Sequence, residues 1–264
     1  LADLDTAEQT AFMRQVYELQ RQRSARGRAF VGDLPAEQLA EVENGIQARR
    51  DAAEACRMLL HAAREALRDD QRRGDRLAMQ VRRIGVSSGY RSAQRQFQNW
   101  RASFPRYYRQ TQDERRRQPG GEHGAAAARL LARYISGRLA APGYSLHNSG
   151  IAIDFSTTQG RQNLGPNTSQ IAQWNRSWFF NWLNNNARNF GFAQNPNIIE
   201  PWHWELVGNI ELIEFSEQEA LMSQAPESEN EGIKQGELVQ PKTAGCKTCS
   251  LGSDLEIQLR SMKS

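Results

Sequence analysis

Two of the four histidines stand close to carboxylates in segments that mix apolar and turn residues. His147 precedes Asp154 by seven positions, and His203 follows Glu200 by three positions. A catalytic zinc ion needs three protein ligands of the histidine or carboxylate kind and one open position for water. His147, Asp154 and His203 supply nitrogen, oxygen and nitrogen atoms, so together they predict a catalytic metal site.

The residues around Asp154 indicate how these ligands come together. Gly150 predicts a turn after His147, and the alternation over residues 151–155 predicts a strand. Ala152 shares a strand face with Asp154, and its small side chain leaves room for a metal ion. A carboxylate in an otherwise apolar strand is costly to bury without a partner, and metal coordination would offset that cost.

A water molecule activated by a metal also needs a base, and Glu200 is placed for that role. Pro201 lets the chain bend between Glu200 and His203, so we expect Glu200 just before a strand. His203 and Glu205 would then share one face of that strand. The two tryptophans that flank His203 would pack into the core from the other face.

Each of these residues alone has an ordinary explanation. A histidine near a strand is more often a core or surface residue than a ligand, and an aspartate in a strand is often a turn or capping residue. The joint pattern is far less expected by chance than its parts, so we keep the metal site as the hypothesis. We interpret His61 and His123 as ordinary surface or helix residues.

Three segments together resemble a known family. They are SSGYRS at 87–92, SLHNSGIAID at 145–154 and EPWHWELVG at 200–208. Their order, internal spacing and residue types resemble the signature segments of the D-Ala-D-Ala carboxypeptidase family of zinc peptidases, which includes the VanY-type enzymes and related phage endolysins. The resemblance covers about residues 77–215. It implies an α+β domain with a small antiparallel sheet flanked by helices.

The resemblance also implies residue roles. It implies Zn²⁺ on His147, Asp154 and His203, with Glu200 as general base. It implies that Arg91 points into the cleft, where it would stabilise the developing oxyanion or hold a substrate carbonyl or carboxylate. An arginine at a strand end is otherwise usually a surface residue. Further positions that match residues lining the substrate cleft are Ser88, Gln96 and Ser145.

Position 205 departs from the pattern of many relatives, which carry arginine two residues after the last zinc histidine. In those relatives the arginine is well placed to meet the terminal carboxylate of a substrate, whereas Glu205 would repel it. One hypothesis is that this chain prefers an internal bond or an amine-bearing substrate and acts as an endopeptidase. The alternative is that Glu205 orients His203 or pairs with Arg91.

The chain divides into three predicted parts. Residues 1–76 predict a helical hairpin, with one helix from about Thr6 to Arg26 and a second from Asp33 to Gly74. Its apolar stripe must pack on the rest of the chain or on a helical partner. Residues 77–215 form the predicted zinc peptidase domain, and residues 216–264 predict a polar, flexible tail.

Within the peptidase part we expect a helix from Ser92 that is interrupted at Pro105, and one amphipathic helix from Ser169 to Phe190. The three cysteines divide into two groups. Cys56 lies on an apolar helical stripe and is predicted to be buried. The CxxC of Cys246 and Cys249 fits a redox pair, half of a metal site or a disulfide.

The net charge of the chain says little about which class of partner it binds. The net charge is +4 and the isoelectric point is about 9.1, which fits attraction to an anionic polymer. A solvated, arginine-rich helical surface is the simpler explanation of this charge, and we expect no nucleic-acid partner. No segment approaches the roughly 18 consecutive apolar residues of a membrane span, and no leader is visible. We expect a periplasmic, cell-envelope, secreted or delivered protein that acts on peptidoglycan peptides.

The sequence therefore predicts metal-assisted hydrolysis of a peptide bond in peptidoglycan stem or cross-link peptides. The rival hypothesis is a non-catalytic scaffold or docking module in a larger envelope, injection or phage-like assembly. The long N-terminal helices and the acidic tail give the rival some support. The complete ligand set and Glu200 argue against it, because a scaffold has no need of a base.

Overall fold

The computed structural model describes residues 6–208 of the 264. These residues fall in one compact unit, Leu1–Ser216. The predicted tail with Cys246 and Cys249 lies outside the described residues. Among the described helices, none has both the length and the apolar character needed to cross a membrane.

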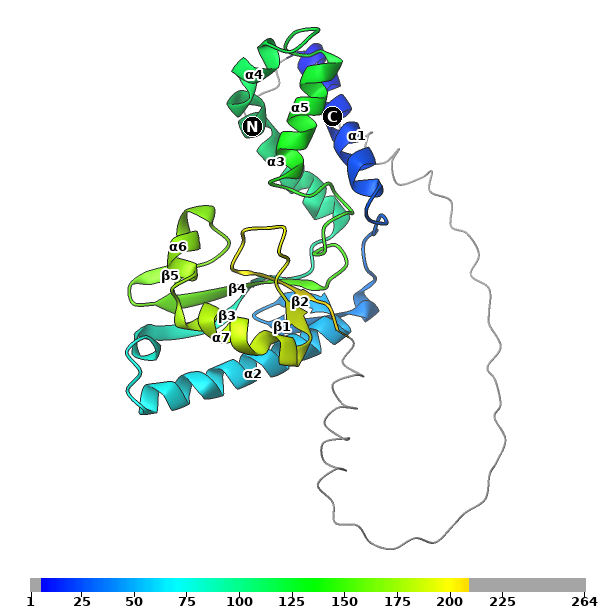
Figure 1. Cartoon of the computed structure of the whole chain (residues 1–264). Helices are drawn as coiled ribbons and strands as arrows, with labels where there is room; N and C mark the ends of the chain where they lie inside the picture. Colours follow the sequence, from blue (N-terminus) through cyan, green and yellow to red (C-terminus); the bar gives the residue numbers. More distant parts are fainter. Residues whose placement is uncertain (1–5, 209–264) are drawn as a thin grey trace, which may run out of the picture. The chain divides into compact units, whose positions relative to one another are not determined.

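A small antiparallel sheet forms the centre of the fold (Figure 1). Its strands follow the order β3 (Val81–Ser88), β4 (Ala152–Gln159), β7 (His203–Leu206) and β6 (Phe192–Ala193). A short strand, β5 (Gln162–Leu164), also pairs with β4. The predicted α+β class with a small antiparallel sheet is confirmed.

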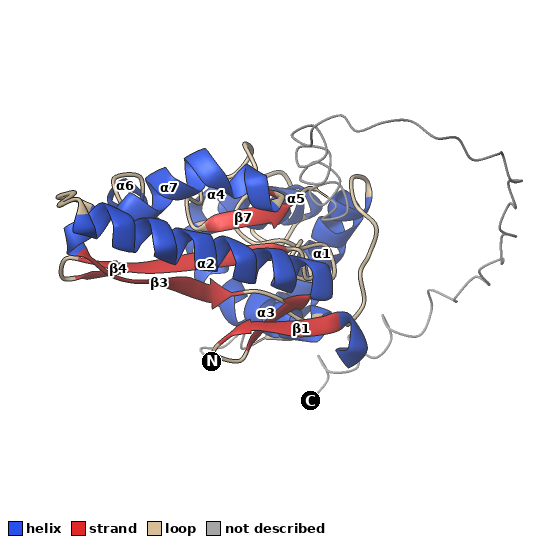
Figure 2. Ribbon diagram, turned by 90° about the horizontal axis from the view of Figure 1, so that it is seen from below, coloured by secondary structure: helices blue, strands red, loops and turns tan. Residues whose placement is uncertain are grey.

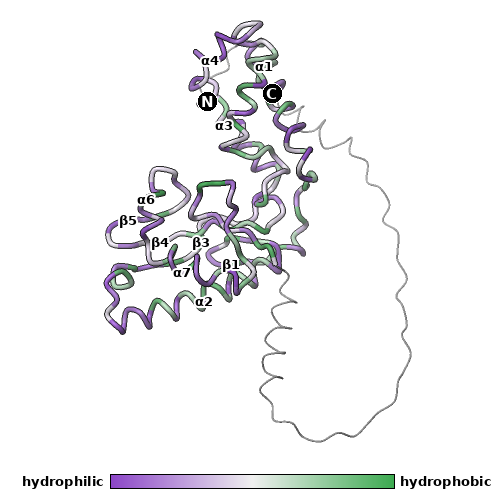
Figure 3. The backbone as a smooth tube through the Cα atoms, viewed as in Figure 1, coloured by the Kyte–Doolittle hydropathy of each residue, from purple (hydrophilic) through white to green (hydrophobic). Residues whose placement is uncertain are grey.

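Helix α2 (Arg50–Arg72) packs on this sheet and shares its core. Figure 2 shows α2 running alongside β3 and β4. Cys56 and Leu59 of α2 are fully buried in the cluster that also contains Ile153 and Phe155 of β4, so the predicted burial of Cys56 is confirmed. Purple and green alternate along α2 in Figure 3, as expected of a helix with one apolar face.

The chain between Leu39 and Arg49 is a β-hairpin rather than the first half of a long helix. Strand β1 (Leu39–Glu43) pairs with β2 (Ile46–Arg49), after a 3₁₀ turn at Ala36–Gln38. Asn44 and Gly45 join the strands with φ of 52° and 75°. Two central residues with positive φ make the turn that suits the twist of a two-residue hairpin, and Asn-Gly is its preferred sequence. The prediction of a helix from Asp33 was wrong for this segment. The Asn-Gly turn outweighs the helical spacing of the apolar residues here.

The predicted N-terminal helical hairpin is also wrong, because α1 and α2 pack on different partners. Helix α1 (Ala7–Ala25) lies against α5 (Ala125–Ser136). Gln20 of α1 is fully buried; it accepts a hydrogen bond from Trp100 Nε1 (2.6 Å) and donates one to Leu139 O (2.7 Å). Figure 1 shows α1 and α5 beside α3 (Ala93–Gln110) and α4 (Gln112–Arg116). The predicted boundary between residues 76 and 77 runs through the core that α2 shares with the sheet.

Two helix predictions need correction in detail. Helix α3 starts after the N-cap Ser92 as expected but continues through Pro105. A proline removes the hydrogen bond to the carbonyl four residues earlier, and the residue at that position, Arg101, is exposed. The predicted helix from Ser169 to Phe190 is divided into a 3₁₀ turn (Thr168–Gln170), α6 (Ile171–Trp174), α7 (Trp178–Asn186) and a second 3₁₀ turn (Ala187–Phe190). A further 3₁₀ turn, Ala78–Gln80, precedes β3.

Candidate metal centre and active site

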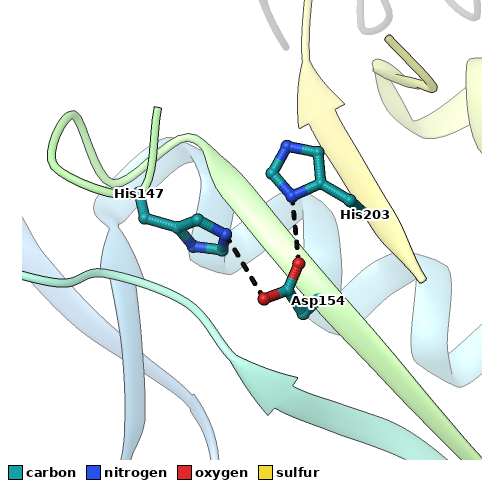
Figure 4. A group of neighbouring side chains, drawn as sticks. All are labelled: His147, Asp154 and His203. Atoms are coloured by element: carbon teal, nitrogen blue, oxygen red, sulfur yellow. Dashed lines mark hydrogen bonds and ion pairs between the residues drawn. The ribbon is translucent and has the colours of Figure 1, made fainter. Parts of the chain in front are cut away.

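Three elements bring the predicted ligands together. Asp154 of β4 and His203 of β7 are direct partners in the antiparallel register, so they lie side by side in the sheet. His147 comes from the loop before β4, where Gly150 turns the chain with a φ of 68°. Figure 4 shows the side chains of both histidines directed at the carboxylate between them.

The three side chains form a buried cluster. His147 Nε2 lies 3.3 Å from Asp154 Oδ2, and His203 Nδ1 lies 3.0 Å from Asp154 Oδ1. The exposed fractions are 5% for His147, 5% for Asp154 and 7% for His203. One potential ligand atom from each residue lies within 4.8 Å of the others. The three residues that the sequence predicts as ligands therefore lie together in one buried cluster.

Each histidine is oriented by an acceptor on the far side of its ring. His147 Nδ1 lies 2.7 Å from Gly89 O, and His203 Nε2 lies 3.3 Å from Glu205 Oε1. A carbonyl and a carboxylate accept hydrogen bonds, so these two ring nitrogens are the donors. The lone pairs of neutral rings are then on His147 Nε2 and His203 Nδ1, the atoms that face Asp154. Such outer partners fix the tautomer and orientation of metal-binding histidines.

The charges of the cluster are strongly coupled. Burial alone would raise the pKa of Asp154, but the two histidines hold it well below its usual value. Burial lowers the pKa of His203, but Asp154 and Glu205 together raise it to about 9. Asp154 is therefore a carboxylate, and its negative charge favours the protonated form of the His203 imidazole.

This donor set fits a divalent metal ion. It offers two imidazole nitrogens and a carboxylate oxygen, the ligand types of a three-ligand catalytic zinc site. A buried carboxylate needs a counter-charge, and a cation between the three side chains would supply it. These three side chains are therefore a group that could hold a metal ion.

Glu200 lies at the turn just before β7, as expected from Pro201. The Glu200 carbonyl accepts a hydrogen bond from the His203 amide (2.9 Å), which closes this turn. Burial raises the pKa of the Glu200 carboxyl above its usual value; His203 opposes the shift and Asp154 adds to it. The Glu200 carboxyl therefore lies within electrostatic reach of the ligand cluster.

Arg91 is held by two of the residues predicted to line the cleft. Its Nη1 donates to Gln96 Oε1 (2.8 Å) and its Nη2 to Ser88 Oγ (3.3 Å). Burial lowers the pKa of Arg91, and the charges of Asp154 and Glu200 raise it, so the guanidinium is partly desolvated and near both carboxyls. Gln96 is 1% exposed and donates onward to Ala140 O (2.9 Å). Its contact with the site runs through Arg91.

Glu205 occupies a position between the metal cluster and a neighbouring loop. Besides His203, its Oε1 accepts from Asn195 Nδ2 at 3.0 Å. Burial raises the pKa of Glu205, but the hydrogen bonds from His203 and Asn195 and the charge of Arg28 lower it below its usual value. Glu205 does not pair with Arg91, which was one of the two roles that the sequence allowed. Its contact with His203 matches the other role, orientation of that histidine.

The loop that carries His147 is bound reciprocally to the loop that carries Arg91. Arg91 N donates to His147 O (3.0 Å), and Asn148 Nδ2 donates to Arg91 O (2.7 Å). Ser145 Oγ accepts from His147 N at 3.3 Å. Ser145 therefore supports the loop as well as lying beside the site.

Sequence reasoning missed three residues that position the site: Gly89, Asn148 and Asn195. Gly89 and Asn148 lie inside the recognised segments, so their neighbours in the sequence were the available signal. A backbone carbonyl that acts as an acceptor cannot be recognised from the type of residue, however. Nothing local marked Asn195, because its partner Glu205 is ten residues away.

The fold and the site together define a candidate metallohydrolase: a small antiparallel sheet carries a buried His–Asp–His cluster beside a carboxyl and an arginine. The family model described as VanY, D-alanyl-D-alanine carboxypeptidase, matches residues 46–209. The chain therefore belongs to the VanY family of D-alanyl-D-alanine carboxypeptidases. The match begins at β2 and includes α2, in agreement with the shared core.

Solved structures show distant similarity. A mutant of the D,D-pentapeptidase VanY from a VanB-type resistance cassette, in complex with Zn(II), is 21% identical, with 72% of this chain and 90% of that chain covered and a TM-score of 0.44. VanYB in complex with D-alanine-D-alanine is 20% identical over 75% of this chain and 98% of that one, with a TM-score of 0.43. No curated protein matches the chain.

Proposed function

We propose that this protein is a zinc peptidase that hydrolyses a peptide bond in peptidoglycan stem or cross-link peptides. The observation that carries the proposal is the buried cluster of His147, Asp154 and His203, with both ring tautomers set for metal binding. Membership in the VanY family supports the substrate class.

Zn²⁺, when bound by this cluster, would act as a Lewis acid that lowers the pKa of a bound water to around 7 and polarises the scissile carbonyl. Glu200 accepts a proton from the attacking water at its carboxylate and returns it to the leaving amine nitrogen. Its raised pKa brings proton uptake closer to neutral pH. Arg91, fixed by Gln96 and Ser88, donates hydrogen bonds to the carbonyl oxygen as negative charge develops there.

The bond that is cut depends on what meets the C-terminal side of the substrate. A carboxypeptidase must accept a free terminal carboxylate, whereas an endopeptidase meets an uncharged amide. The contacts of Glu205 support a role in orienting His203. These contacts do not remove the repulsion between Glu205 and a terminal carboxylate, which is the basis of the endopeptidase hypothesis. A carboxypeptidase would need a neighbouring cation to balance that repulsion.

The test compares the wild type with Glu200→Ala in zinc content and in hydrolysis of purified peptidoglycan. We expect about one zinc ion per chain in both proteins and products from the wild type only. The masses of the products then identify the bond: release of free D-Ala alone would exclude an endopeptidase.

Two other results would contradict the proposal. Zinc in both proteins without products from either would favour the non-catalytic scaffold. Absence of zinc from both proteins would remove the basis of the proposed chemistry.

A further inference from the structure

The segment that joins α1 to β1 lies against the loop of His147. We call residues 28–34 the strap. Val31 N donates to Gly143 O at 2.8 Å. The ring of Phe30 occupies the space where a side chain at Gly143 would lie, and it meets the ring of Tyr144 edge to face at 5.7 Å. Gly143 has a φ of 80°, so both its conformation and this close contact require glycine.

The other end of the strap is fixed on the loop of Arg91. Asp33 Oδ1 accepts from Ala93 N at 2.6 Å, and Leu34 N donates to Tyr90 OH at 2.8 Å. The strap is therefore bound at both ends to loops that carry site residues. A side chain within it has a defined position relative to the metal cluster.

Arg28, at the start of the strap, contacts the loop that carries His147. Its Nη1 donates to Tyr144 O (3.3 Å), three residues before His147. Arg28 is exposed, and this bond takes one N–H of a guanidinium that carries five. Its positive charge also acts on Glu205, which contacts His203. Arg28 thus combines a fixed place at the rim of the site with donors that face solvent.

The negative charges around the cluster indicate a role for Arg28 in substrate binding. Asp154, Glu200 and Glu205 are all carboxyls, so a substrate that ends in a carboxylate needs a cation on its approach side. Arg91, fixed by Gln96 and Ser88, is the donor proposed above for the carbonyl oxygen of the scissile bond. We propose that Arg28 binds the C-terminal carboxylate of the peptide substrate and so directs cleavage to the end of the chain. Arginine suits this role because its planar fork can bind a carboxylate through two hydrogen bonds.

This inference rests on the proposed function but concerns a residue outside the matched family region, residues 46–209. It makes Arg28 a specificity residue and favours a carboxypeptidase over an endopeptidase. The experiment must therefore separate carboxylate recognition from catalysis.

The test measures peptide binding without turnover. Zinc-loaded full-length Glu200→Ala protein is titrated calorimetrically with N-acetyl-D-Ala-D-Ala and with the same peptide ending in an amide. We expect the free carboxylate to bind roughly 10- to 100-fold more tightly, as for a charge-assisted hydrogen bond. Adding Arg28→Ala should bring the ratio of the two dissociation constants close to one, and Arg28→Lys should give an intermediate ratio.

Arg26→Ala is the matched control, because Arg26 is an exposed arginine at the C-cap of α1, two positions before Arg28. It should keep the wild-type ratio. An undiminished ratio in Arg28→Ala would overturn the inference and leave the proposed function standing, with Arg91 as the alternative carboxylate ligand. Absence of binding by either peptide would contradict the proposed substrate itself, and the inference with it.

Discussion

At the scale of single residues, the proposed metal site includes hydrogen-bond acceptors that are not ligands themselves. Gly89 O and Glu205 Oε1 each take the outer N–H of one histidine and so would leave the inner nitrogen free for a metal ion. The two acceptors differ in kind, because Gly89 contributes a backbone atom that no substitution removes. Glu205 contributes a side chain and can be tested.

Glu205→Ala should weaken zinc binding by roughly 10- to 100-fold, the usual effect of losing such an outer partner. The apparent dissociation constant can be measured by competition with a chromophoric chelator. Asn195→Ala is the control, since Asn195 contacts Glu205 but not His203, and its effect should be smaller. Equal zinc affinity in the wild type and Glu205→Ala would show that His203 needs no orienting carboxylate.

Arg91→Ala should lower kcat by about 10²–10³ while zinc content stays near one ion per chain, as for the loss of an oxyanion-stabilising donor. The physical reason is that Arg91 is already positioned by Gln96 and Ser88 near Asp154 and Glu200. Arg109→Ala, at an exposed position in the last turn of α3, is the control. An unchanged kcat in Arg91→Ala would remove Arg91 from the catalytic residues.

The pH dependence of zinc binding follows from His203. Its pKa in the metal-free protein is raised from 6.5 to about 9, so the stability that its proton contributes is complete below pH 6.5 and is lost as pH rises through 9. Zinc must displace this proton, so its affinity should rise over the same window by about tenfold per pH unit for one proton released. The gain in Tm on adding zinc should therefore grow from pH 6.5 to 9. A gain that does not change with pH would contradict this.

The residues of the site were largely predictable because their chemistry is local. His147 and Asp154 lie on either side of a glycine turn, and His203 lies in a short strand between two tryptophans, so type and spacing carried the information. The supporting contacts were not predictable in the same way. The bond between Asp33 and Ala93 spans 60 positions, and only the fold brings such pairs together.

At the scale of elements, the two loops of the site, which carry Arg91 and His147, are held together by the chain before them. Besides the strap, the hairpin contributes: Gln47 O accepts from Tyr90 N (2.6 Å), and Arg49 N donates to Gly150 O (2.9 Å). The sequence pattern of residues 33–49 was interpreted as helix because Leu39, Val42 and Ile46 share helical spacing. The Asn-Gly pair between two short strands was the stronger signal, since that turn fixes both strands.

Asp33→Ala tests the strap as a positioning element. The substitution removes the acceptor for Ala93 N, next to the N-cap of α3, and should cost about 1 kcal/mol of stability, as for a helix cap. Because α3 begins two residues after Arg91, kcat should also fall severalfold with zinc content unchanged. Asp33→Asn keeps an acceptor oxygen and should restore most of the activity.

Glu37→Ala, in the exposed 3₁₀ turn that follows the strap, is the control for Asp33→Ala. A loss of stability in Asp33→Ala without any change in kcat would mean that the bond to Ala93 is structural only.

At the scale of the whole molecule, the sheet and α2 form one folding unit that the sequence had divided. The stripe of α2 was recognised, but the sheet that covers it is built from strands that come later in the chain. An apolar stripe on a helix indicates that another part of the molecule covers it, but it does not identify that part. The fully buried Cys56, on the face of α2 that joins the sheet residues in the core, reports on this packing.

Cys56 should resist alkylation in the folded protein. Burial raises the pKa of its thiol, and the thiolate is the reactive form, so both access and charge oppose the reaction. The experiment uses Cys246→Ser/Cys249→Ser, which leaves Cys56 as the single thiol, and follows iodoacetamide labelling by mass at increasing urea. Labelling should begin only where the far-ultraviolet circular dichroism signal is lost, because α2 must leave the sheet to expose the thiol. Rapid labelling without urea would show that α2 separates from the sheet in the native state, as an independent N-terminal part would.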